Sequence, residues 1–127
     1  MVLNDPSLLH EQCYIDGKWL SANSGETVAI ANPATQQILG HVPVMGAAET
    51  QVAIDAANKA LPAWRALTAK ERSAKLRRWF ELLHENADDL ALMMTSEQGK
   101  PLAEAKGEVT YAASFIEWFA EEAKRVY

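Results

Sequence analysis

The chain has 127 residues, of which 49% are hydrophobic and 23% charged, and its formal net charge is −5. These values are those of one soluble globular domain or a piece of one. The negative charge gives no general electrostatic attraction to nucleic acid or to an anionic membrane. The single Cys13 excludes a disulfide within the chain, which fits a reducing compartment. The N-terminus has no secretory signal, and no apolar run approaches the ~20 residues of a membrane span, so we expect a cytoplasmic protein.

Residues 1–46 are predicted to form an irregular or short helical arm and then a small β meander. Asp16-Gly17 lies between two β-forming segments and is a strong hairpin signal, because a two-residue turn requires positive φ at both positions. Asn32-Pro33 is a turn pair that separates the third strand from the fourth. The four expected strands are Cys13–Ile15, Lys18–Leu20, Thr27–Ala31 and 38–44.

Residues 47–127 have a helical repeat and are predicted to form four α-helices. Thr68 and Glu71 have the spacing of a capping box, in which the hydroxyl and the carboxylate satisfy each other's backbone N–H groups at the start of the second helix. The other expected boundaries are Pro62, where the first helix stops, Asn86, which caps the third helix, and Gly99, which ends it.

The last segment, 101–126, is predicted to be one long helix with an unusually wide apolar arc. Tyr111, Phe115 and Trp118 widen this arc to roughly 220°, against the ~100° of a helix that packs on one side only. The first apolar stripe consists of Leu102, Ala105, Val109, Ala112, Ile116, Phe119, Ala123 and Val126. The arc expected to be solvated carries Lys106, Thr110, Ser114, Glu117, Glu121 and Lys124. We therefore expect a partner chain or a missing C-terminal part to cover this helix.

A search for catalytic chemistry assigns no catalytic, cofactor-binding or metal-ligating residue. The scattered glycines form no phosphate-binding motif, and His10, His41 and His84 lack the spacing of metal ligands. Cys13 is expected to be a structural thiol, because no base or helix N-terminus is evident to activate it. Glu108 lies inside the apolar arc, so we expect it to be buried with a partner, with contact to an ion or ligand as the alternative.

Two groups of charged residues are interpreted as surface. Asp88-Asp89 is expected to lie at the start of a helix, where negative charge interacts favourably with the helix dipole. A basic run on the second predicted helix is expected to be a solvated face beside Glu71 and Glu81 rather than a phosphate site. Its members are Lys70, Arg72, Lys75, Arg77 and Arg78.

The chain resembles the opening of NAD(P)-dependent aldehyde dehydrogenases in a series of short segments. These are YIDGKW at 14–19, NPAT at 32–35, LGHVP at 39–43, PAWR at 62–65 and KER at 70–72. The most specific segment is EQGKPLAEA at 97–105, followed by GEV at 107–109. Together with YAASFIEWFA at 111–120, it is similar to the succinate-semialdehyde (or glutarate-semialdehyde) dehydrogenase branch. The resemblance covers nearly the whole chain but only about the first quarter of the family's length.

The resemblance implies the α/β aldehyde dehydrogenase fold, with residues 1–127 as an N-terminal part that flanks the cofactor-binding domain, in a homo-oligomer. It implies that a small-molecule semialdehyde is oxidised to a dicarboxylate with NAD or NADP as the cofactor. In this family a cysteine attacks the aldehyde, a hydride passes to nicotinamide, and a glutamate-assisted water cleaves the thioester. The parts that perform these steps belong beyond Tyr127, so the 127-residue chain is expected to be inactive alone.

Cys13 does not match the catalytic motif of the family, so that role is not carried over to it. Many members also hold a monovalent cation against an acid on this last helix; Glu104 and Glu108 are both possible counterparts, and neither is assigned. An alternative from a different class is a stand-alone helical interaction module, in which the apolar arc forms a symmetric dimer interface. A small metal- or thiol-dependent enzyme is the third hypothesis.

Overall fold

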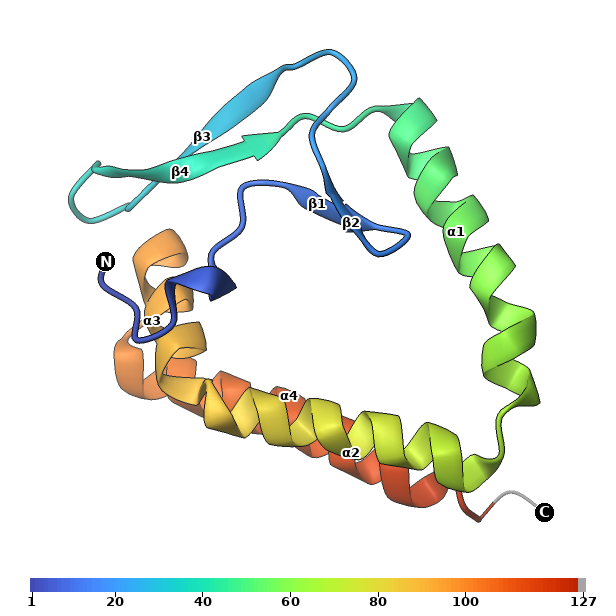
Figure 1. Cartoon of the computed structure of the whole chain (residues 1–127). Helices are drawn as coiled ribbons and strands as arrows, with labels where there is room; N and C mark the ends of the chain where they lie inside the picture. The colour runs from blue at the N-terminus through green and yellow to red at the C-terminus, as the bar shows by residue number, and fades with distance from the viewer. Residues whose placement is uncertain (126–127) are drawn as a thin grey trace.

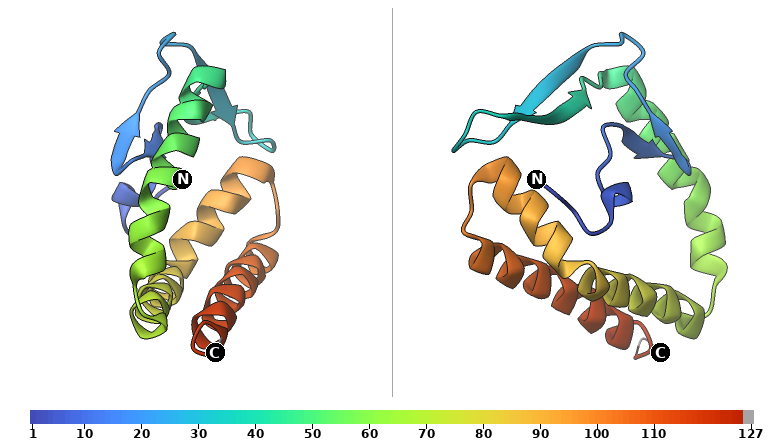
Figure 2. Two further views of the ribbon diagram at one scale, coloured as in Figure 1. Left: turned by 90° about the vertical axis from the view of Figure 1, so that its right-hand side faces the viewer. Right: turned by 60° about the vertical axis from the view of Figure 1, so that its left-hand side comes forward.

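The computed structural model describes residues 1–125. The last helix ends at Glu122, so its predicted continuation through residues 123–125 is wrong, and the predicted end at Val126 lies outside the described residues. The elements are arranged in chain order around an open ring, with α2 and α4 lying side by side along one side of it (Figures 1 and 2). These elements are η1 (Pro6–Leu8), β1 (Cys13–Ile15), β2 (Lys18–Leu20), β3 (Thr27–Ala31), β4 (Ile38–Pro43), α1 (Ala47–Ala66), α2 (Ala69–Glu85), α3 (Ala87–Gln98) and α4 (Leu102–Glu122).

The four strands occur in the predicted order and pair as two antiparallel hairpins, β1 with β2 and β3 with β4. Asp16 and Gly17 have φ values of 49° and 78°, which confirms the tight turn between β1 and β2. The strands form two separate two-stranded sheets, so the meander is a pair of consecutive hairpins rather than one continuous sheet. Glu49 connects this region to α1, because its carboxylate accepts hydrogen bonds from the N–H groups of Asn23 (2.9 Å) and Gly46 (3.0 Å).

The predicted end of the first helix near Pro62 is wrong, because α1 continues through this proline to Ala66. Proline lacks an N–H group, so its cost in a helix is the loss of one backbone hydrogen bond and crowding against the preceding turn. Only one more turn is formed before the chain becomes extended at Leu67 (ψ 147°). Trp64 therefore lies within α1 instead of after it.

The predicted starts and ends of α2 and α3 are largely confirmed. Glu71 N–H donates to the Thr68 hydroxyl (3.3 Å), and Thr68 N–H donates to the Glu71 carboxylate (2.8 Å), which is the expected capping box. Gly99 ends α3 in the left-handed conformation with φ 77°. Asn86 occupies the N-cap position of α3, but its side chain donates to the Leu82 carbonyl (2.9 Å) instead of accepting from the first turn.

The core is small and lies where α3 packs against α4. Its buried members are Ala91, Ala105 and Val109, and the half-buried side chains around it are Ala87, Leu90 and Met94. Among the described residues no large side chain is fully buried. Short side chains at the contact allow helices to approach closely, but they remove little apolar area from water, so this core contributes little stabilisation.

Two glycines provide a matched test of this backbone. In Gly99→Ala, the new methyl group would sit 3.1 Å from Pro33 Cγ and the residue would need a positive φ, so we expect the free energy of unfolding to fall by about 1–2 kcal/mol. Gly107 lies inside α4 with open space at its Cβ position, so Gly107→Ala should raise it by about 0.5–1 kcal/mol. Urea titrations monitored by far-UV circular dichroism measure both values. Equal shifts in the same direction would contradict this assignment.

Candidate functional site

One side of α4 packs against α2 and α3 through small residues. The buried positions on this side are Ala105, Val109, Ala113 and Ala120. The predicted apolar stripe is therefore only partly correct, because Ala112 and Phe119 are exposed while Ala113 and Ala120 are buried. The side of α4 with the alanines packs against the other helices, and the side with Phe119 does not, because short side chains allow the helix backbones to approach more closely.

Glu117 lies on this packed side and was expected to be fully solvated, which is wrong. It is half-buried, and its carboxylate accepts a hydrogen bond from Arg77 Nη1 of α2 at 2.6 Å. Arg77 also lies 3.7 Å from Glu81, its neighbour one turn along α2. A charge-assisted bond of this geometry fixes the register of α4 against α2.

The opposite side of α4 presents a cluster of aromatic side chains to solvent, here called the aromatic face. Its members are Tyr111, Phe115, Trp118 and Phe119, which are between 46% and 64% exposed. The rings of Tyr111 and Phe115 meet edge to face, with centroids 4.9 Å apart. Phe115, Trp118, Phe119 and Ser114 line a mainly apolar groove. The wide apolar arc predicted for this helix is confirmed: Ala105 and Val109 of the arc are buried against α3, and the described residues leave its aromatic members uncovered.

The total surface of the chain agrees with this exposure. Its solvent-accessible area is 8903 Å², whereas a compact protein of 14.0 kDa would expose about 6,700 Å². The excess of about 2,200 Å² per chain is in the range that one partner contributes to a permanent interface. This excess covers polar and apolar surface of the whole chain, and the aromatic face is part of it.

Glu108 was expected to be buried, and this prediction is wrong. Its side chain is 46% exposed and forms an ion pair with Lys100, which the turn after α3 brings alongside the first turns of α4. The two residues, together with Glu104, Gly107 and Tyr111, line an open hollow. The predicted partner of Glu108 therefore exists, but the pair is solvated.

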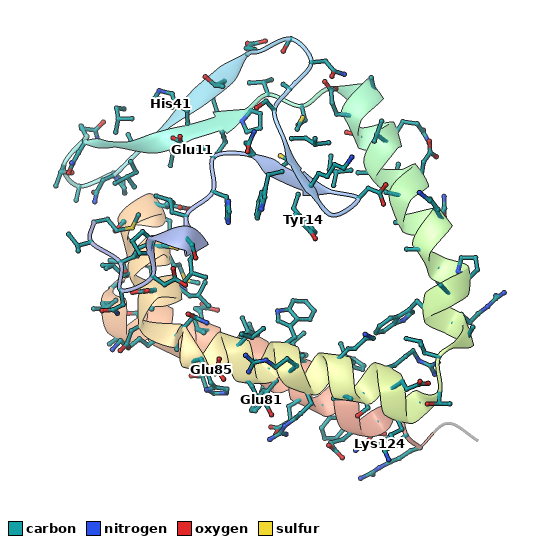
Figure 3. The ribbon with its side chains drawn as sticks, in the orientation of Figure 1. Glu11, Tyr14, His41, Glu81, Glu85 and Lys124 are labelled. Carbon is teal, nitrogen blue, oxygen red and sulfur yellow. The ribbon has the colours of Figure 1, made fainter. Side chains whose placement is uncertain are left out.

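The basic run on α2 lies mainly at the surface, as predicted, and its members Arg77 and Arg78 form ion pairs with glutamates. Arg78 Nη1 donates to Glu85 at 2.8 Å and lies 3.6 Å from Glu81, and these contacts hold the pKa of Arg78 above its ordinary value (Figure 3).

Cys13 is half-buried in β1. Within residues 1–125, no three His, Cys, Asp or Glu side chains are grouped closely enough to hold a metal ion. None of the helices in this range is long and apolar enough to cross a membrane.

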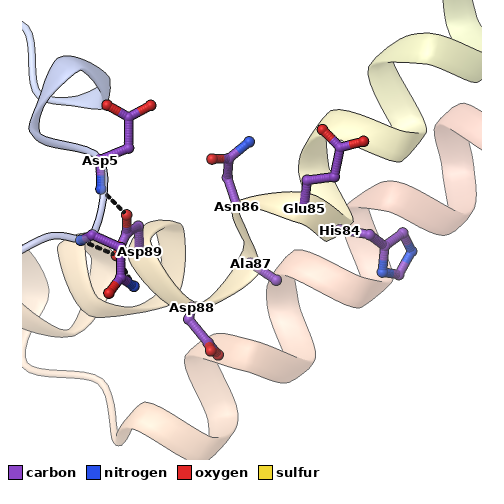
Figure 4. A pocket seen from close by; sticks show the side chains of 8 residues that line it. Asp5, His84, Glu85, Asn86, Ala87, Asp88 and Asp89 are labelled. Atoms are coloured by element: carbon purple, nitrogen blue, oxygen red, sulfur yellow. Dashed lines mark hydrogen bonds between the residues drawn. The ribbon is translucent and has the colours of Figure 1, made fainter.

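Asp89 is the residue whose role the sequence interpretation missed. It is 4% exposed, and its carboxylate accepts hydrogen bonds from Asn4 N–H (2.9 Å), Asn4 Nδ2 (3.0 Å) and Asp5 N–H (2.8 Å) (Figure 4). The backbone N–H groups of Asn4 and Asp5 lower the pKa of the Asp89 carboxyl. Its neighbour Asp88 faces solvent and pairs with Lys106 at 2.7 Å. Both carboxylates lie in the first turn of α3, as predicted, and they have different partners.

A sequence profile of the aldehyde dehydrogenase family matches residues 19–127. The chain belongs to the aldehyde dehydrogenase family. Among its curated relatives, glutarate-semialdehyde dehydrogenase of Pseudomonas putida is 70% identical over all 127 residues, and an NADP⁺-linked succinate-semialdehyde dehydrogenase of Escherichia coli is 66% identical. These 127 residues span 26% of the length of each of these relatives.

Solved structures of aldehyde dehydrogenases confirm the arrangement of the elements. An NADP-dependent enzyme from Escherichia coli superposes with a TM-score of 0.97 at 66% identity, over 99% of this chain and 26% of that one. Succinate-semialdehyde dehydrogenase from Burkholderia pseudomallei gives 0.95 at 63% identity, over 98% of this chain and 26% of that one. The open ring with its aromatic face is therefore similar to part of a larger aldehyde dehydrogenase structure.

The aromatic face can be tested with a fluorescent probe of exposed apolar surface. We expect the 127-residue chain to bind anilinonaphthalene sulfonate, and Trp118→Ser with Phe119→Ser to lower the fluorescence. Because both side chains are exposed, each substitution should change the free energy of unfolding by less than about 0.5 kcal/mol. Tyr14→Ser, at an equally exposed aromatic residue on β1, is the matched control. Unchanged fluorescence in the α4 variant would show that this face is already covered.

The docking of Asn4 and Asp5 on Asp89 should depend on pH in one direction. Since the pKa of Asp89 is lowered in the folded chain, its contribution to stability is complete above the ordinary Asp value of about 3.9 and is lost as pH falls through the depressed value. The protection factors of the Asn4 and Asp5 amides, measured by NMR hydrogen exchange from pH 6 downwards and corrected for the intrinsic pH dependence of exchange, should fall only below about pH 4. In Asp89→Asn this acid-dependent step should be absent; its persistence would assign it to another carboxyl group.

Proposed function

We propose that the chain is the N-terminal part of an NAD(P)-dependent semialdehyde dehydrogenase that oxidises succinate or glutarate semialdehyde to the dicarboxylate. The observation that carries this proposal is the identity of 66–70% to enzymes named for these two substrates, over the entire chain. The EQGKPLAEA segment at 97–105, which resembles the same branch, agrees with this proposal. Such identity supports the substrate class and leaves both semialdehydes as candidates.

The proposed enzyme needs residues beyond 127 for its chemistry. A nicotinamide cofactor, NAD or NADP, supplies the hydride acceptor, and we assign no catalytic, cofactor-binding or metal-ligating residue to this chain. Residues 1–127 flank the cofactor-binding domain and provide a surface for it. The aromatic face, with Tyr111 and Trp118 exposed, is the surface that the next part of the enzyme covers. The proposed enzyme is cytoplasmic and a homo-oligomer.

A second candidate function is a stand-alone interaction module, which the same exposed face favours. In that case the aromatic face would be buried between two copies of the 127-residue chain. Light scattering and calorimetry separate the two functions: a monodisperse dimer that melts cooperatively favours the module, and a monomer or an aggregating chain favours the enzyme part.

The proposed function predicts where activity is found. The purified 127-residue chain should form no NADH or NADPH from succinate or glutarate semialdehyde, measured at 340 nm, because the nucleophile and the cofactor site lie outside it. The reading frame beyond residue 127 should encode a strand, then Pro-Trp-Asn-Phe-Pro and, later, a catalytic cysteine. The protein translated from that whole frame should be active with at least one semialdehyde. Activity in the 127-residue chain, or an inactive whole protein, would contradict the proposal.

A further inference from the structure

The N-terminal arm, residues 1–12, lies before the start of the family match at residue 19, yet it contacts three separate elements. Asn4 and Asp5 bind to α3, Glu11 binds to β4, and His10 lies against β2. In Figure 1 the arm runs between α3 and the first hairpin, across the inner side of the ring.

The first contact, between the arm and Asp89, is the strongest, because it gives hydrogen-bond donors to a buried carboxylate. The three bonds from Asn4 and Asp5 are the partners that the structure gives to the Asp89 carboxylate. A buried carboxylate without partners is costly. Separating the arm from α3 would leave this buried carboxylate without partners, so the two segments stay together although the bonded residues are 85 and 84 positions apart in the sequence.

The second contact lies next to a glycine. The Glu11 carboxylate accepts a hydrogen bond from the backbone N–H of His41 at 2.6 Å, and a Cβ atom at Gly40 would lie 2.7 Å from the same oxygen. Glu11 and His41 are drawn in Figure 3, where the arm passes beneath β4. In the third contact the rings of His10 and Trp19 stack with centroids 3.5 Å apart. The two hairpins are thus both attached to the arm.

Besides the arm, α1 also contacts the hairpin region: its Glu49 carboxylate accepts a hydrogen bond from Asn23 N–H at 2.9 Å, and the β1–β2 turn lies beside Ala53 and Ala57. Lys59 of α1 lies 3.8 Å from Asp16, and a Cβ atom added to Gly99 at the end of α3 would lie 3.1 Å from Pro33 in the β3–β4 turn. We infer that the N-terminal arm is a strap that closes the ring and fixes both hairpins against α3, with Asp89 and Glu11 as its two anchor points. The strap holds the inward-pointing Tyr14 of β1 in place on the inner side of the ring (Figure 3).

Hydrogen exchange measured by mass spectrometry tests the strap on the 127-residue chain. Asp89→Asn places an amide opposite two backbone donors, so exchange should increase about tenfold in the arm and also in β1, β2 and β4, with α2 and α4 unchanged. Asp88→Asn, at the solvated neighbour, is the matched control and should leave all four segments as they are. Faster exchange in the arm alone would overturn the inference, because the hairpins would then be held without it.

A second variant covers the case in which Asp89→Asn loses its helices by circular dichroism. Glu11→Ala removes only the contact between the arm and His41 of β4. Amide exchange should increase severalfold in β3 and β4, while the arm amides bonded to Asp89 stay protected. Glu26→Ala, in the loop before β3, is its control. Unchanged exchange in β3 and β4 of Glu11→Ala would overturn the inference. These readouts need no activity, so their failure is distinct from a failure of the proposed enzyme function.

Discussion

The packing of α4 against α2 and α3 through short side chains is the contact on which the remaining structure depends. A row of alanine and valine allows three helices to come together, and the Arg77–Glu117 bond fixes their register. The same choice of residues forces every aromatic side chain of α4 to other sides of the helix. The helices that α4 contacts cannot bury its largest apolar side chains, because these side chains point away from the contact. The exposed aromatic face is thus a direct result of how the core is made.

Local signals in the sequence were sufficient for most of the fold. The Asp16-Gly17 turn, the Thr68–Glu71 capping box and the glycine at position 99 each act within a few residues, and all three predictions are confirmed. Pro62 shows the limit of such signals, because a proline near a helix end costs one bond and the remaining turn still forms. The start of a strand or helix is encoded locally, whereas its exact end also depends on the conformation of the next segment of chain.

Long-range partners could not be predicted in the same way. Asp89 looks like an ordinary helix-start acid, since the arm that satisfies it lies at the other end of the chain. Glu108 lies beside the exposed aromatic residues of α4, and its ion-pair partner Lys100 comes from the turn after α3, which a helical pattern does not predict. For the aromatic face, the width of the arc predicted that a cover is required, and the family comparison indicates the kind of protein that supplies it.

The uncovered state of α4 also has a consequence for biosynthesis. If 127 residues are 26% of the proposed enzyme, about 360 more must leave the ribosome before the aromatic face can be enclosed. At typical translation speeds this takes roughly 20–70 s. During that interval Trp118 and Phe119 are available to other nascent chains and to chaperones that bind exposed apolar segments. If this segment folds around its alanine row before the rest is synthesised, its aromatic side chains stay exposed to solvent until the proposed enzyme is complete.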